Sequence, residues 1–160
     1  MTSLPEPSEE DVAAITAQLG RPPAAKFAVI VRRFDGTPVV IQNEPHLRDG
    51  TPIPTLYWLV DPELVEAVSR IEGAGGVHRF EVMVDATALQ QSHDEYAERR
   101  TAAIERPDLP APTGGVGGTR QGVKCLHAHL ANHLAGFTDP VGQIVAAELD
   151  LPSFVVGFGH

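Results

Sequence analysis

The sequence is short of cysteine, of basic residues and of long hydrophobic runs. Cys125 is the only cysteine in 160 residues, so no disulfide can form within the chain, which is typical of reducing compartments. Lysine and arginine together number 12 against 21 acidic residues, and the net charge of −9 repels nucleic acid. No hydrophobic stretch approaches the ~20 residues of a membrane-spanning helix, and residues 1–11 lack the basic flank and apolar core of a secretory signal. We therefore expect a cytoplasmic protein without nucleic-acid or membrane partners.

The composition is that of a folded protein. Hydrophobic residues make up 42% of the chain and charged residues 21%, which are ordinary values for a globular domain. A length of 160 residues fits one domain. We expect a loose tail over residues 1–7 and a single α+β domain over residues 8–160.

The hydrophobic pattern predicts a small sheet packed with helices. Runs of β-branched and apolar residues predict strands at 26–33, 38–42, 55–60 and 77–84. Helical spacing and the capping residues Ser8, Asp61 and Asp139 predict helices at 9–19, 62–72, 87–106, 123–135 and from Asp139 onward. The apolar segment 154–160 is expected to dock on them. This order favours an α+β fold with a mainly antiparallel sheet of about four strands and four or five helices, although the strand at 55–60 could instead open a crossover unit.

The densest run of candidate chemistry is Gly114–His133. Residues 113–120 read TGGVGGTR, and such glycines free main-chain N–H groups to converge on an anion. A helix follows, whose amino end carries partial positive charge, and no Asp or Glu occurs between residues 109 and 138. We predict that a phosphate-like anion binds Gly114, Gly115, Gly117, Gly118, Thr119, Arg120 and Lys124. The competing interpretation is a tightly packed loop in which the glycines allow close backbone approach.

The following helix, VKCLHAHLANHLAG, offers possible metal ligands. Cys125, His129 and His133 are four residues apart and would share one helical stripe, a partial zinc site that needs a further ligand. Candidates for that ligand are His78, His93 and Asp61. The alternative is that the cysteine and histidines are packing residues, so the cofactor stays unknown.

The sequence leaves open whether the protein is an enzyme. If a reaction occurs, His127 or His129 would carry the proton because imidazole titrates near neutral pH, and Cys125 at a helix start would be the nucleophile. A further alternative is a non-catalytic partner-binding or scaffold protein, with residues 154–158 as an apolar interface.

One helix face carries His93, Tyr96 and Arg100. These side chains could line a polar pocket beside the glycine loop. We favour instead a half-buried face from which the arginine reaches toward solvent.

Two blocks resemble a known family. Asp49–Val77 and Gly114–Gly136 (GGVGGTRQGVKCLHAHLANHLAG) are similar to domain of unknown function family 501, a bacterial family common in actinobacteria, and the hairpin at 26–42 also fits it. The resemblance implies no established activity. Family genes often lie beside an exopolyphosphatase-like gene, which favours a phosphate-bearing ligand. Many members carry further cysteines where this chain has Phe34-Asp35 and Val60-Asp61, so the resemblance implies that a site of several thiolates cannot form here.

Overall fold

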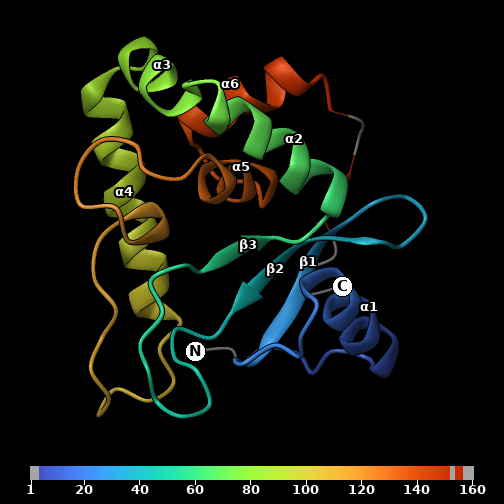
Figure 1. The fold of residues 1–160 in the computed structure, drawn as a ribbon. Coiled ribbons are helices and arrows are strands. Elements are labelled where there is room, and N and C mark those ends of the chain that lie inside the picture. The colour runs from blue at the N-terminus through green and yellow to red at the C-terminus, as the bar shows by residue number, and fades with distance from the viewer. Residues whose placement is uncertain (1–3, 152–153, 157–160) are drawn as a thin grey trace.

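The computed structural model describes residues 4–151 and 154–156. Its elements confirm the α+β fold (Figure 1) and follow in this order along the chain: α1 (Glu9–Leu19), β1 (Phe27–Arg32), β2 (Pro38–Asn43), β3 (Tyr57–Leu59), α2 (Pro62–Gly73), α3 (Gly76–Met83), α4 (Ala86–Ala102), η1 (Val116–Gly118), α5 (Leu126–Leu134), α6 (Pro140–Leu149) and β4 (Val155–Val156).

The sheet is antiparallel, with the strand order β3-β2-β1-β4. Ala28 of β1 lies opposite Gln42 of β2, and the register shifts between Val29 and Val31. β3 pairs antiparallel with β2, so the crossover alternative is wrong. β3 is therefore an edge strand, and one of its edges has no strand neighbour among the described residues.

The prediction of a strand at 77–84 is wrong, because residues 77–83 lie in α3 and Val84 caps that helix. Gly75 adopts the left-handed conformation with φ 85°, which separates α3 from the end of α2. The apolar residues at this point fit a helical period as well as an alternating one: Phe80 is buried, and Val77 and Val84 pack on the same core. Val82 is 68% exposed, which a central strand would not allow.

The described residues form six α-helices, rather than the four or five expected, because of α3. The fourth strand is the two-residue β4, which pairs with β1. It belongs to the apolar segment 154–160, which we expected to pack on the rest of the fold. Residues 157–160 of that segment lie outside the described residues, as do residues 1–3 of the expected tail. None of the described helices is long and apolar enough to cross a membrane.

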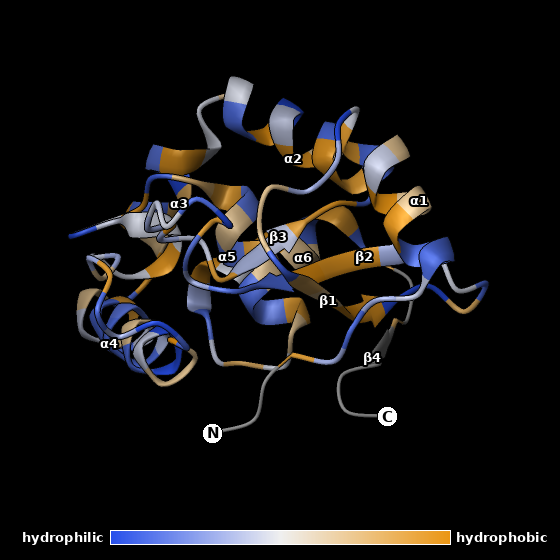
Figure 2. Cartoon of the chain, turned by 90° about the horizontal axis from the view of Figure 1, so that it is seen from below, coloured by the Kyte–Doolittle hydropathy of each residue, from blue (hydrophilic) through white to orange (hydrophobic). Residues whose placement is uncertain are grey.

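Two hydrophobic clusters hold the layers together. Along β3, Tyr57 and Leu59 belong to the larger cluster, while Trp58 contacts the smaller one, as expected when side chains alternate between the faces of a sheet. The smaller cluster gathers around Ile15 of α1. Figure 2 shows the hydrophobic colour concentrated in β1 and β2, whereas α4 is largely hydrophilic.

Candidate functional site

Four main-chain N–H groups of the glycine loop are hydrogen-bonded within the protein. The amide of Gly115 donates to Thr119 O at 2.8 Å, and the amide of Gly118 donates to Gly115 O at 3.0 Å. The amide of Thr119 donates to Val116 O at 3.1 Å, and the amide of Val116 donates to Nδ1 of His93 at 3.0 Å. These four donors do not converge on a common hollow.

The loop directs its carbonyl oxygens at a cation instead. The side chain of Arg100 from α4 is 2% exposed and donates to Gly114 O at 2.6 Å, Gly115 O at 3.3 Å and Pro54 O at 2.9 Å. Burial lowers the pKa of this guanidinium from its ordinary value. From the sequence we expected Arg100 to reach toward solvent, and this expectation is wrong. The side chain is buried and anchors the loop to α4.

His93 fixes the other side of the loop. Because Nδ1 accepts the amide of Val116, the ring nitrogen Nε2 carries the hydrogen and donates to Gly122 O at 2.8 Å. Burial lowers the pKa of His93. A Cβ at Gly115 would lie 2.4 Å from the Cβ of His93, so this glycine allows close approach, as the competing interpretation proposed.

The protein's own carboxylates occupy the amino end of α5. Glu81 of α3 accepts the amide of Val123 at 2.6 Å, and Glu72 of α2 accepts the amide of Leu126 at 2.8 Å. The cations Arg120 and Lys124 are exposed. Anion binding at Gly114, Gly115, Gly117, Gly118, Thr119, Arg120 and Lys124 stays a prediction, but the hydrogen bonds of the loop do not support it.

The structure does not bring Cys125, His129 and His133 together. The prediction placed all three in one helix, whereas α5 begins at Leu126 and Cys125 has an extended backbone with φ −135°. Cys125 is the N-cap of α5, and its carbonyl accepts the amide of His129 at 3.3 Å, but its side chain does not join those of His129 and His133 in a group able to hold a metal. Among the residues that the structure describes, the group able to hold a metal consists of Glu72, Cys125 and His127.

The atoms of this group lie close together. Nδ1 of His127 is 3.9 Å from Sγ of Cys125 and 3.3 Å from Oε2 of Glu72. On the other side of the ring, Nε2 lies 3.1 Å from both Val65 O and Ser69 Oγ. Since a carbonyl oxygen only accepts hydrogen bonds, Nε2 carries a hydrogen, and Nδ1 faces the thiol and the carboxylate.

The surroundings of His127 favour a positive charge on the ring. Its hydrogen bond with Cys125 is the largest effect and is assisted by Val65 O and Glu72, while burial opposes it. Together these contacts raise the pKa of His127 to about 9. The raised pKa means that the ring of His127 holds a proton near neutral pH, and a metal ion at Nδ1 would have to displace that proton.

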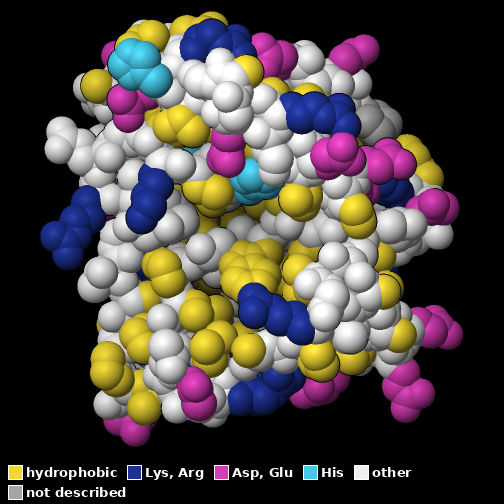
Figure 3. Space-filling view, in the orientation of Figure 1, with side chains coloured by type: hydrophobic (Ala, Val, Ile, Leu, Met, Phe, Trp, Pro, Cys, Tyr) yellow, Lys and Arg dark blue, Asp and Glu magenta, His cyan; other side chains and the backbone are white. Residues whose placement is uncertain are grey.

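A hollow of about 250 Å³ adjoins this group. Cys125 and His127 line it together with Tyr57, Trp58 and Leu59 of the edge strand β3. Figure 3 shows one face of the molecule hollowed at its centre, where hydrophobic side chains gather and a histidine lies on the rim. Such a hollow suits a small, mostly apolar ligand.

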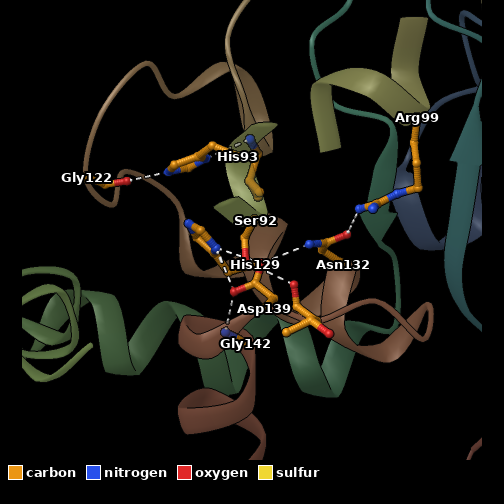
Figure 4. A network of polar contacts seen from close by, with 10 residues as sticks. Ser92, His93, Arg99, Gly122, His129, Asn132, Asp139 and Gly142 are labelled. Atoms are coloured by element: carbon orange, nitrogen blue, oxygen red, sulfur yellow. Dashed lines mark hydrogen bonds and ion pairs between the residues drawn. The ribbon is translucent and has the colours of Figure 1, made fainter. Parts of the chain in front are cut away.

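His129, the other candidate proton carrier, lies in a buried network (Figure 4). Its Nδ1 is 2.9 Å from Oδ2 of Asp139, a residue that also accepts from Asn132 and from the amide of Gly142. Burial alone would raise the pKa of Asp139, but these hydrogen bonds outweigh it and lower the pKa below its ordinary value. Both side chains are 0% exposed and line none of the hollows described here, so His129 is placed for stability.

The three candidates for a further metal ligand have other environments. Asp61 caps α2 and forms an ion pair with Arg33, His93 holds the glycine loop, and His78 is exposed on α3. Sequence reasoning missed Glu72. The available signal was weak, since Glu72 lies in the last turn of a helix whose polar residues indicate only a solvated face.

Comparison with known proteins identifies a family but no activity. A family model described as "Protein of unknown function (DUF501)" matches residues 29–147, which is well over half of the chain. No curated protein matches the sequence. No solved structure matches it either.

Proposed function

The chain belongs to the DUF501 family of proteins of unknown function, and we propose that it binds a zinc ion through Glu72, Cys125 and His127. The observation that supports this proposal is the placement of three ligand atoms of different types within 4.8 Å of one another. Thiolate, imidazole and carboxylate are the groups that bind zinc in proteins.

The spacing of the ligand atoms suits a tetrahedral ion. Zinc–ligand bonds of about 2.0–2.3 Å place neighbouring ligand atoms roughly 3.3–3.7 Å apart. The distance of 3.3 Å between His127 Nδ1 and Glu72 Oε2 agrees with this value, and the 3.9 Å from Nδ1 to Cys125 Sγ requires a small contraction.

The second nitrogen of His127 supports the same assignment. Metal-binding histidines usually donate their other N–H to a carbonyl or carboxylate, which fixes the tautomer and the plane of the ring. Here Nε2 contacts Val65 O and Ser69 Oγ of α2, so Nδ1 is oriented before any metal binds.

Three protein ligands leave a fourth position for water or substrate, which is the pattern of catalytic zinc sites. The adjoining hollow, lined by Cys125 and His127, would hold the substrate beside this position. A zinc ion held by these residues would supply a water whose pKa is lowered enough for it to act as a nucleophile near neutral pH. The class of activity that we propose is therefore hydrolysis of a small, mostly apolar substrate.

Metal analysis of the protein purified without a histidine tag tests the proposal. We expect about one equivalent of zinc per chain, and a thiolate-to-metal charge-transfer band after replacement by Co²⁺. Cys125→Ser and Glu72→Gln should abolish the band or weaken binding, while the exposed His78→Gln should behave as the wild type. A wild-type protein with neither bound zinc nor a cobalt band would rule the proposal out.

A second candidate function uses the same residues without a metal. Cys125 immediately precedes α5, and a histidine nitrogen lies 3.9 Å from its sulfur, which is the arrangement of an activated thiol nucleophile. Alkylation by iodoacetamide separates the two functions. Zinc should protect Cys125 and a chelator should expose it, whereas a metal-free nucleophile should react equally with and without chelator.

A further inference from the structure

A second hollow lies where the sheet meets the end of α4. Its volume is about 330 Å³, and its walls are mostly apolar. Ile30 of β1, Tyr57 of β3 and Phe137, which follows α5, contribute to these walls, and Ala102 lines it from the last residue of α4. One charged side chain, Arg99, also lines it.

Arg99 differs in its partners from the arginines that form ion pairs. Five arginines each pair with a carboxylate: Arg32, Arg33, Arg70, Arg79 and Arg106. Arg99 has no such partner among the described residues. Its Nη2 donates to Asn132 Oδ1 at 2.8 Å, and its buried Nε has no acceptor within the part of the chain that the structure describes.

Aromatic rings hold this guanidinium in place. Its central carbon lies 3.7 Å from the centre of the Phe137 ring, and that ring stacks on Tyr57 with a centroid distance of 5.6 Å. A guanidinium placed over a ring in this way can still donate N–H groups at its edge to a ligand. The hollow therefore combines apolar walls with an oriented, uncompensated positive charge.

We infer that this hollow binds a small monocarboxylate with an apolar body. The guanidinium pairs with a carboxylate in a planar, charge-assisted geometry, and the apolar walls bury the rest of the molecule. Arg99 is the one charged residue lining the hollow, so a single negative charge matches it. The inference does not depend on a metal, although Tyr57 lines both hollows.

Calorimetric titration with benzoate and hexanoate tests this inference, with benzamide and hexanamide as neutral analogues. We expect the acids to bind at least about tenfold more tightly than the amides. Arg99→Gln should remove this preference, and Arg120→Gln, at an exposed arginine, should retain it. Equal binding of acids and amides to the wild type would overturn the inference.

Two further variants keep the test decisive. Ala102→Leu narrows the hollow without touching the hydrogen bond of Arg99, and should abolish acid binding even if Arg99→Gln does not fold. Cys125→Ser separates this site from the proposed zinc centre, since acid binding should survive the loss of zinc. Binding that disappears in Cys125→Ser but persists in Ala102→Leu would place the acid on the metal and refute the inference.

Discussion

Single residues in this protein act through close contacts that their sequence neighbours do not specify. Gly115 is required by the ring of His93, and Arg100 satisfies three backbone carbonyl oxygens in a buried position. Ser69 donates to the carbonyl of Val65 and also contacts Nε2 of His127. Each of these contacts leads to a test at one position.

Replacing Gly115 by alanine should destabilise the fold. The new Cβ would lie 2.4–2.6 Å from three atoms of His93, and displacing that buried ring should cost about 1–3 kcal/mol in the free energy of unfolding. Urea denaturation measures this loss. Gly73→Ala is the matched control because nothing lies within 4 Å of its Cβ position, and equal stability of the two variants would contradict the assigned role.

Replacing Ser69 by alanine should weaken zinc binding. Loss of a contact that orients a ligating histidine typically costs 10–100-fold in metal affinity, and we expect about tenfold here. Competition with a chromophoric chelator measures the affinity. Thr16→Ala removes the same kind of hydroxyl-to-carbonyl bond in α1, far from the site, and should leave the affinity unchanged.

At the scale of elements, α4 and the glycine loop form a unit. The loop that includes η1 is held by Arg100 and His93 of α4. The amino end of α5 is likewise satisfied by Glu72 of α2 and Glu81 of α3. Segment 109–138 contains no acidic residue, but two other helices place carboxylates against it. These contacts join positions far apart in the sequence, so the sequence did not indicate them.

Arg100→Met should detach the loop from α4. The carbonyl oxygens of Pro54 and Gly114 would lose this donor and Gly115 O would keep only the amide of Gly118, which we expect to cost about 3 kcal/mol or more of the free energy of unfolding. Urea denaturation measures the change. Arg70→Met removes an exposed ion pair on α2 and should cost less than about 1 kcal/mol, so a similar loss in both variants would argue against the anchoring role.

At the scale of the whole molecule, one buried network joins three helices. Asp139 precedes α6 and contacts His129 and Asn132 of α5, and Asn132 in turn accepts from Arg99 of α4 (Figure 4). This network connects the packing of the helices with the hollow that Arg99 lines. Because it contains an ionised carboxylate, it also couples the fold to pH.

The stability of the protein should fall in acid because of Asp139. Its folded-state pKa is lowered, so its contribution is complete above the unfolded value of about 3.9 and is lost as the pH falls through the folded value. The stability difference between wild type and Asp139→Asn should therefore shrink as the pH is lowered from 7. Asp108→Asn, at an exposed aspartate, should track the wild type, and a pH-independent difference for Asp139→Asn would contradict this linkage.

The sequence determined the features that depend on neighbouring residues. Capping by Ser8, Asp61 and Asp139 was visible in advance, as were three strands and the α+β class, because capping and hydrophobic periodicity act over a few positions. The prediction of a strand at 77–84 failed because the apolar residues of this segment fit a helical period as well as the alternating period of a strand. Only the tertiary structure decided that Glu72 meets Cys125 and His127, and that the loop carbonyls face Arg100. Those contacts join distant segments, and the packing of whole helices, rather than any local preference, brings them together.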